Sequence, residues 1–349
     1  MTVDGATTLE DHGVPRKRLP SLTSLRFFGA ALVVGVHVGA LFPTASSVAQ
    51  HGQVGVSFFY LLSGFVLTWA PSTTDTAMRF YRRRIARIIP VHVLTWTIAV
   101  AFIPLVTNTQ QDWLGNFLAL PLLQAWIPTG SIAFAGNGVA WSLSVEVFFY
   151  ALFPLITPLV WRLSGRKLWL LLGAMILAIL LVAGLSPLNG LIYIFPISRL
   201  PEFVIGVCLA VLMQRGWRPP LNLTAAATLA ALTTLVGYFP GVPDRYSFVA
   251  ITVIPYALLI SAACASDIDG GSFLSPKVLI RAGEWSFALF MTHQLVVKVY
   301  GWLVPSLSIR LYLLPLLLVF CVALAWATFR FIEQPLERRL RGQQGPLPA

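Results

Sequence analysis

Long apolar runs separated by short polar loops fill most of the chain, from residue 22 to residue 332. A helix needs about 20 mostly apolar residues to cross a bilayer, whereas a barrel strand needs only about 10. The lengths of the runs therefore predict an all-α polytopic membrane protein, a bundle of about ten transmembrane helices. The expected spans are 22–43, 55–70, 88–106, 140–161, 168–185, 197–213, 222–240, 246–264, 284–305 and 309–332, of which the second and sixth are short.

Composition supports this reading and excludes several classes of protein. Charged residues make up 11% of the chain and hydrophobic residues 57%, whereas about a quarter of a soluble domain is charged. So few charges cannot cover a water-facing surface, which excludes a soluble enzyme, a disordered chain and a nucleic-acid-binding domain. The net charge of +11 then indicates basic loops facing anionic lipid headgroups, so the lipid bilayer is the predicted partner.

The distribution of lysine and arginine predicts the orientation of the bundle. With the N-terminus in the cytoplasm, 18 of the 24 basic residues fall in cytoplasmic segments, and only Arg245 and Arg310 fall outside. Because basic loops stay in the cytoplasm, both termini are predicted to be cytoplasmic, in the inner (plasma) membrane. The chain then divides into an N-terminal tail (1–21), a transmembrane domain (22–336) and a basic C-terminal tail (337–349). The apolar part of the longest outer loop, Trp113 to Leu123, is expected along the interface.

Ionisable residues inside the predicted spans are functional candidates. A charged group at the bilayer centre costs at least about 2.5 kcal/mol, so such residues are rare unless they are needed. Arg199 and Glu202 are one helical turn apart and are expected to pair with each other. His293 lies near the middle of its predicted span, where a role in helix packing is the plainer reading. The complete set is Arg26, His37, Glu146, Arg199, Glu202, His293 and Lys298.

Arg26 and His37 share the first predicted span. Their separation of eleven residues is close to three helical turns, so both point to one face, about 16 Å apart along the axis. Arg26 lies near the cytoplasmic end and His37 past the middle. Two plainer readings stay open: an interfacial arginine whose charged end reaches the headgroups, and a buried histidine bonded to a carbonyl.

Glu146 is predicted at the same depth as His37, about one and a half turns from the outer end of the fourth span. A histidine is the natural partner for a buried carboxylate. Such a pair can act as a general base, because the carboxylate orients the imidazole and stabilises its protonated form. Ser142 and Tyr150 lie one turn before and one turn after Glu146 on the same face. The alternative is a hydrogen bond that only joins two helices.

A run of arginines, from Arg79 to Arg87, stands just before the third predicted span. Basic residues at this place commonly set topology and contact lipid headgroups. Arg84 and Arg87 are one turn apart at the membrane boundary. They could also hold a phosphate or pyrophosphate, because the guanidinium matches phosphate oxygens in bidentate fashion.

Six motifs in this chain resemble, in order, those of the acyltransferase-3 family of integral membrane O-acyltransferases. They cover residues 21 to 336, and the family's ten-helix core and cytoplasmic termini agree with the spans counted above. Two aromatic positions differ, since Phe287 and Phe290 stand where tyrosines are common. The motifs are Leu22–Arg26 with His37, Gly55–Phe65, Arg84–Pro90, Trp141–Tyr150, Trp285–His293 and Phe331–Pro335.

The resemblance implies transfer of an acyl group, commonly acetyl, from acyl-CoA to a hydroxyl of a carbohydrate or glycoside. It implies a catalytic His37 with Glu146 near the reacting centre. Arg26, Arg84 and Arg87 are expected to serve the donor, with Ser142 and Tyr150 beside them in the binding site. No metal and no permanently bound cofactor is expected; acyl-CoA is a co-substrate.

Two other functions stay open from the sequence. A transporter or flippase could use the same intramembrane charges as a proton relay. A tailoring acyltransferase would keep the chemistry and change the acceptor, from a cell-envelope glycan to a sugar of a macrolide-type secondary metabolite.

Overall fold

The structure is a computed structural model, and it describes residues 18–42, 54–69, 76–107, 110–185, 193–236 and 246–341. The described residues form helices and loops, with no strand among them, as the apolar runs predict. Within the described residues, each of the ten predicted spans is largely helical. Most of the predicted N-terminal tail, 1–17, and the last residues of the predicted C-terminal tail, 342–349, lie outside the described residues.

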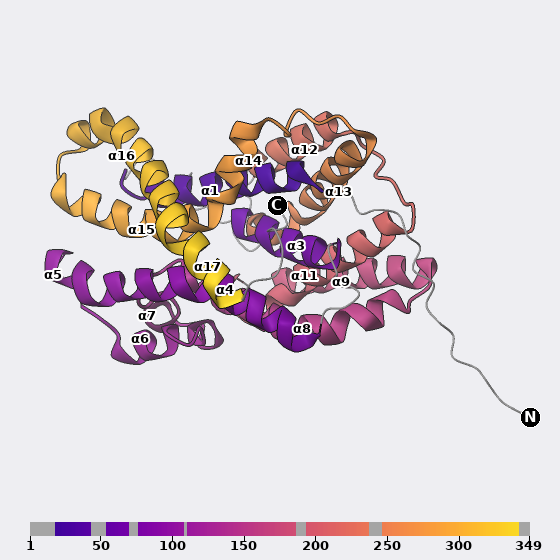
Figure 1. The fold of residues 1–349 in the computed structure, drawn as a ribbon, viewed down its shortest axis with the longest axis horizontal. Helices are drawn as coiled ribbons and strands as arrows, with labels where there is room; N and C mark the ends of the chain where they lie inside the picture. Colours follow the sequence, from indigo (N-terminus) through magenta and orange to yellow (C-terminus); the bar gives the residue numbers. More distant parts are fainter. Residues whose placement is uncertain are drawn as a thin grey trace, which may run out of the picture.

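Most of the described chain is helical (Figure 1). Three π-helical segments interrupt or precede longer helices: η3 (Ile98–Phe102), η5 (Tyr246–Ala250) and η6 (Phe329–Glu333). The α-helices that carry the fold are α1 (Pro20–Gly39), α3 (Val54–Trp69), α4 (Ala77–Thr97), α5 (Ile103–Thr107), α6 (Trp113–Ala119), α7 (Gly130–Ala133), α8 (Ala140–Trp161), α9 (Gly165–Leu185), α11 (Pro196–Gln214), α12 (Leu223–Val236), α13 (Val253–Asp269), α14 (Lys277–Glu284), α15 (Ser286–Leu303), α16 (Leu307–Thr328) and α17 (Gln334–Arg341).

Among the described residues, six helical stretches are long and apolar enough to cross a membrane, so the protein is a multi-pass membrane protein. Helices α3 and α12 are apolar but shorter. The count of ten spans and the cytoplasmic termini stay predictions. The six stretches are Pro20–Gly39, Ala77–Thr107, Ala140–Trp161, Gly165–Gly184, Pro196–Gln214 and Leu307–Arg341.

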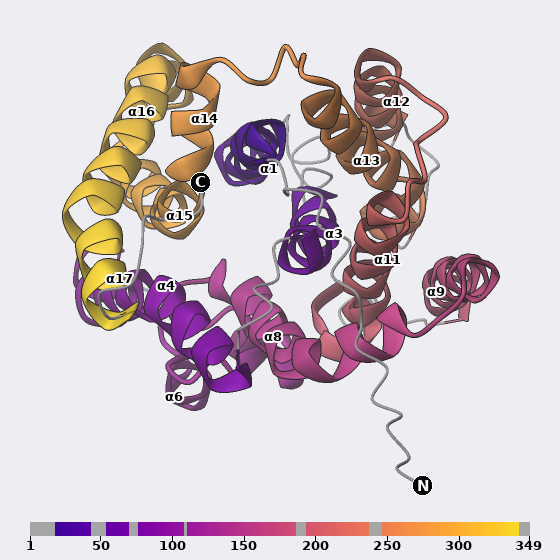
Figure 2. The ribbon, with the colours of Figure 1, turned by 45° about the vertical axis from the view of Figure 1, so that its right-hand side comes forward.

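Helices α1 and α3 stand in the middle of the bundle, and the other long helices surround them (Figure 2). Helix α1 packs on α14, α15, α3 and α13, and α3 packs on α11, α13 and α8. Helix α9 lies at the outside of this ring. The arrangement turns one face of α1 and one face of α3 toward α4, α8 and α15, where the candidate site lies.

The contact between α3 and α11 is close enough for their backbones to touch. Gly64 faces the backbone of Phe203, and Gly206 faces the backbone of Leu61, so a Cβ at either glycine would collide with a neighbouring carbonyl. Small residues allow such close packing between helices in a membrane. The contact is what brings the polar side chains of the two helices together.

The predicted pair of Arg199 and Glu202 is confirmed on α11. Arg199 Nε lies 3.0 Å from Glu202 Oε2, and both side chains are buried. Arg199 also donates a hydrogen bond to Ser57 Oγ at 2.9 Å, and its guanidinium lies 5.1 Å from the ring of Tyr60. This intramembrane charge is therefore neutralised inside the fold itself.

Short helices of the segment 113–133 cover the first turns of α8. Ser144 donates a hydrogen bond to the carbonyl of Leu122, and the ring of Trp126 packs edge-on against Phe148. The large apolar side chains of α6 face outward: Trp113 is 71% exposed and Phe117 is 74% exposed. Their position along the membrane interface stays a prediction.

Candidate active site

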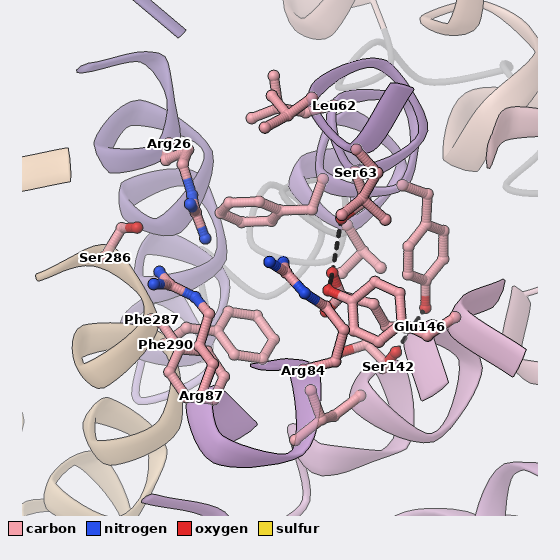
Figure 3. Close-up of a pocket in the computed structure, with 17 residues that line it drawn as sticks. Arg26, Leu62, Ser63, Arg84, Arg87, Ser142, Glu146, Ser286, Phe287 and Phe290 are labelled. Carbon is pink, nitrogen blue, oxygen red and sulfur yellow. Dashed lines mark hydrogen bonds between the residues drawn. The ribbon is translucent and has the colours of Figure 1, made fainter. Parts of the chain in front are cut away.

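A partly open pocket lies between α1, α3, α4, α8 and α15. Six of the seven side chains predicted for the site line it, and the seventh, His37, does not. Figure 3 shows three guanidinium groups pointing into the same space, that of Arg26 from α1 and those of Arg84 and Arg87 from α4. The six predicted lining residues are Arg26, Arg84, Arg87, Ser142, Glu146 and Tyr150.

The periodicity of α8 places three of these residues on the pocket wall. Ser142, Glu146 and Tyr150 follow one another at intervals of four residues, so they share one helix face as predicted. Ser142 Oγ donates to the carbonyl of Val139 at 3.0 Å, and the carbonyl of Ser142 accepts a hydrogen bond from Tyr60 Oη at 3.2 Å. The wall is therefore fixed to α3 by hydrogen bonds.

The carboxylate of Glu146 is held by two hydroxyl groups. Oε1 accepts a hydrogen bond from Ser63 Oγ at 2.6 Å and another from Tyr150 Oη at 2.5 Å. Ser63 comes from α3 and Tyr150 from the next turn of α8. Both hydroxyl groups donate to the same oxygen, so they fix the orientation of the Glu146 side chain between α3 and α8.

The three arginines differ in their partners. Arg87 on α4 makes two long ion pairs, 3.9 Å to Glu333 on η6 and 3.8 Å to Glu337 on α17. Glu337 also pairs with Arg341, so the residues 337–341 of the predicted C-terminal tail belong to a helix packed on α4.

Arg84 and Arg26 have no ion pair within the part of the chain that the structure describes. The guanidinium of Arg84 lies over the rings of Phe80 and Tyr150, at 5.8 and 5.9 Å, and its buried Nε has no hydrogen-bond partner. Arg26 reaches the same pocket from α1. The pocket thus holds more positive than negative charge, and its unpaired guanidinium groups suit an anion with phosphate or carboxylate oxygens.

His37 pairs with His293 and not with Glu146. His37 Nδ1 lies 3.1 Å from His293 Nε2 and 2.9 Å from the carbonyl of Val33, and the two rings meet edge to face with their centres 5.0 Å apart. The predicted pair of His37 and Glu146 is therefore wrong.

The depth of Glu146 explains this error. The segment 113–133 covers the first turns of α8, so α8 does not begin at a free outer surface. Counting turns from its first apolar residue therefore does not give the position of Glu146 relative to His37. Glu146 instead shares the pocket of Arg26, eleven residues before His37 on α1.

Phe290 on α15 joins the pocket to the histidine pair. Its ring lines the pocket, lies 6.1 Å from the ring of His293 and contacts Phe59 at 6.0 Å. Along α1, the helical rise from Arg26 to His37 is about 16 Å. The arginine-rich pocket and the imidazole pair thus lie at two positions along α1. Aromatic rings lie next to both.

The family model of the acyltransferase domain (acyltransferase-3) matches residues 19–330, which is most of the chain. The chain belongs to the acyltransferase-3 family. The protein is therefore an acyltransferase, as the resemblance of its motifs implied. No solved structure matches this chain.

Three relatives differ in their identity to this chain and in how much of their own length it matches. Acyltransferase MdmB of Streptomyces mycarofaciens is 36% identical over 313 residues, 81% of this chain and 80% of MdmB. O-acetyltransferase OatA of Staphylococcus aureus is 25% identical, and the match covers 92% of this chain but only 57% of OatA. Exopolysaccharide production protein ExoZ of Rhizobium meliloti is 26% identical over 87% of this chain and 96% of ExoZ.

Several residues of this acyltransferase's site were not assigned a role from the sequence. Ser63 lies in the motif Gly55–Phe65, and Glu333 lies in the motif Phe331–Pro335. Both residues therefore belong to segments that the sequence motifs indicate. His293 is one of the ionisable groups within the predicted spans, where the sequence favours a role in helix packing. Its partner could not be read from the chain, because 256 residues separate it from His37.

Proposed function

We propose that this acyltransferase moves an acyl group, with acetyl as the first candidate, from acyl-CoA to a hydroxyl of a carbohydrate or glycoside. One observation carries the proposal. Arg26 and Arg84 converge, without acidic partners among the described residues, on a pocket that Phe290 connects to the pair of His37 and His293. The relatives named acyltransferase and O-acetyltransferase support the chemistry.

Arg26, Arg84 and Arg87 would bind the phosphates of the donor. Coenzyme A carries phosphate groups at one end and the acyl thioester at the other, so an extended donor needs an anion site and a distant reactive group. The arginine pocket provides the first, and the imidazole pair lies about 16 Å further along α1. The acyl-bearing end would pass Phe59 and Phe290, whose rings offer an apolar wall.

His37 would act as the general base. Its imidazole removes the proton from the acceptor hydroxyl while the hydroxyl oxygen attacks the thioester carbonyl carbon. The C–S bond then breaks, and the sulfur of coenzyme A takes the proton back from His37. In a two-step variant, the imidazole itself is acylated first and the hydroxyl attacks the acyl-histidine.

Glu146 would serve the donor pocket and not the base. The bonds from Ser63 and Tyr150 hold its carboxylate among the arginines, where it limits their mutual repulsion. Ser142 and Tyr150 line the same wall. In this account Glu146 positions the guanidinium groups that bind phosphate.

Two acceptor classes agree with the relatives. The similarity to ExoZ, an exopolysaccharide production protein, supports a cell-envelope carbohydrate in the plasma membrane. The match to MdmB covers about four fifths of both chains and supports a short acyltransferase of similar build, for which a glycosylated metabolite such as a macrolide is the second candidate. A transporter or flippase finds no support among these names.

Mass spectrometry of matched strains tests the proposal. Envelope sugars and secreted glycosides would be compared between a deletion strain, a strain complemented with this chain, and a strain complemented with His37→Ala. The expected result is an acyl ester that is present only with the unaltered chain, together with release of free coenzyme A by membranes given acetyl-CoA. Identical glycans and glycosides in all strains, without coenzyme A release, would contradict the proposal.

A further inference from the structure

Helices α1 and α15 bring two imidazole rings into hydrogen-bond contact. His37 Nδ1 and His293 Nε2 are 3.1 Å apart. Each histidine also has its Nδ1 against the backbone carbonyl one turn earlier on its own helix, at 2.9 Å to Val33 O for His37 and 2.9 Å to Leu289 O for His293. His293 is fully buried.

The two carbonyls determine where the protons lie. A carbonyl oxygen only accepts hydrogen bonds, so the Nδ1 atom of each ring must carry a hydrogen. A neutral imidazole has a single N–H, so His293 Nε2 holds a lone pair and accepts from His37 Nδ1–H. That hydrogen is shared between His293 Nε2 and the carbonyl of Val33. The remaining lone pair of His37 is therefore on Nε2.

His293 must be neutral for this contact to hold. A hydrogen on His293 Nε2 would face the N–H of His37, and two donors repel one another. A charged imidazolium without solvent or a carboxylate would also be costly at this depth. The groups that face His293 are the ring of Phe290, the carbonyl of Leu289 and the ring of His37, none of them a carboxylate.

We propose that His293 is a positioning residue: it fixes the ring orientation and the tautomer of His37, so that Nε2 of His37 is the free basic nitrogen. The inference rests on the proposed function, in which His37 is the base. When His37 gains a proton at Nε2, its Nδ1–H becomes a stronger donor toward Val33 and His293, and both acceptors stabilise the cation.

His293 takes the place of the carboxylate that orients the histidine in other general-base sites. A third group commonly orients a catalytic histidine through its second nitrogen. A carboxylate would be a buried charge in the bilayer, whereas a neutral imidazole accepts the same hydrogen bond without that cost.

The experiment compares three variants in lipid nanodiscs with ¹⁵N-histidine labelling. His293→Leu removes the acceptor and keeps an apolar side chain, and His293→Gln restores an acceptor oxygen. His92→Leu is the matched control, because His92 is also a fully buried histidine of a long helix, bonded to the backbone carbonyls of Ala119 and Leu120. Solid-state NMR reads the contact in the unaltered protein.

The expected result has two parts. The spectrum shows a coupling across the hydrogen bond between His37 Nδ1 and His293 Nε2, with His37 Nε2 unprotonated. His293→Leu lowers kcat by about 10–100-fold, the size of one hydrogen bond to a charged group. His293→Gln recovers much of the loss, and folded His92→Leu keeps the kcat of the unaltered protein.

Two results would overturn the inference: a protonated Nε2 on His37 without the coupling, or a well-folded His293→Leu enzyme with unchanged kcat. The NMR measurement uses the unaltered protein, so it tests the proposal even when His293→Leu does not fold. Failure of the proposed function has a different signature. In that case His37→Ala retains full transfer activity, even though the spectrum still shows the coupling.

Discussion

Two arginine environments in this molecule differ in one respect. Arg199 is buried on α11 with its own carboxylate, Glu202, at 3.0 Å, and with Ser57 and the ring of Tyr60 around it. Arg84 is packed against two aromatic rings and has no ion pair among the described residues. An arginine with its own carboxylate beside it stabilises the fold, whereas a pocket arginine without an ion pair is arranged for an incoming anion.

Arg87 lies between these two cases. Its ion pairs to Glu333 and Glu337, at 3.9 and 3.8 Å, are longer than the pair on α11, and its side chain is 23% exposed. Because a long and partly exposed pair is weaker than a short buried one, a phosphate group can compete for this guanidinium. Arg199 is thus a structural charge, whereas Arg84 and Arg87 are charges that a ligand can bind. Substitutions at both kinds of site test this difference.

Breaking the pair on α11 should have the largest effect. Arg199→Leu leaves Glu202 buried without its partner, and we expect the free energy of unfolding to fall by about 3–5 kcal/mol. The double variant Arg199→Leu/Glu202→Leu should recover most of this loss, because no unpaired charge stays buried. Equilibrium unfolding in bicelles measures both. An equally stable Arg199→Leu protein with a raised KM for acyl-CoA would instead place Arg199 in the donor site.

Replacing a pocket arginine should change binding and leave stability nearly unaltered. Arg84→Ala is expected to raise the KM for acyl-CoA by about 10–100-fold, which corresponds to the loss of about 1.5–3 kcal/mol from hydrogen bonds to a charged group. The free energy of unfolding should shift by less than about 1 kcal/mol. Arg84→Lys should rescue poorly, because the ammonium group lacks the planar fork.

An arginine outside the pocket is the matched control for this prediction. Arg166 is exposed at the start of α9, and Arg166→Ala should leave the KM unchanged. Equal effects of Arg84→Ala and Arg166→Ala would show that the basic residues act through general surface charge alone.

The sequence predicted the pair on α11 and the wall of α8 because both follow from spacing within one helix. Arg199 and Glu202 are one turn apart, and Ser142, Glu146 and Tyr150 share a face whatever the surrounding fold. Contacts between residues of different helices cannot be derived from the spacing within one helix. The partner of His37 comes from α15, and depth along α8 depends on the segment 113–133, which packs over its first turns.

The smallest effect should come from the acidic partners of Arg87. Glu333→Gln removes one of two carboxylates that compete with the donor phosphates, so we expect the affinity for coenzyme A to rise by about 0.5–1 kcal/mol. Isothermal titration at low and high salt measures this change, and the gain should shrink as salt screens the pocket. Weaker binding in this variant would indicate that Glu333 positions Arg87 for the donor and does not compete with it.

The central claim is that the unpaired guanidinium groups bind the phosphates of the donor. Calorimetric titration of the unaltered protein and of Arg26→Ala/Arg84→Ala, with coenzyme A and with pantetheine, tests it most directly, because pantetheine has the same thiol arm without phosphate. The account predicts that the unaltered protein binds coenzyme A much more tightly than pantetheine, and that the double variant binds both with the same weak affinity. An unchanged affinity for coenzyme A in the folded double variant would contradict it.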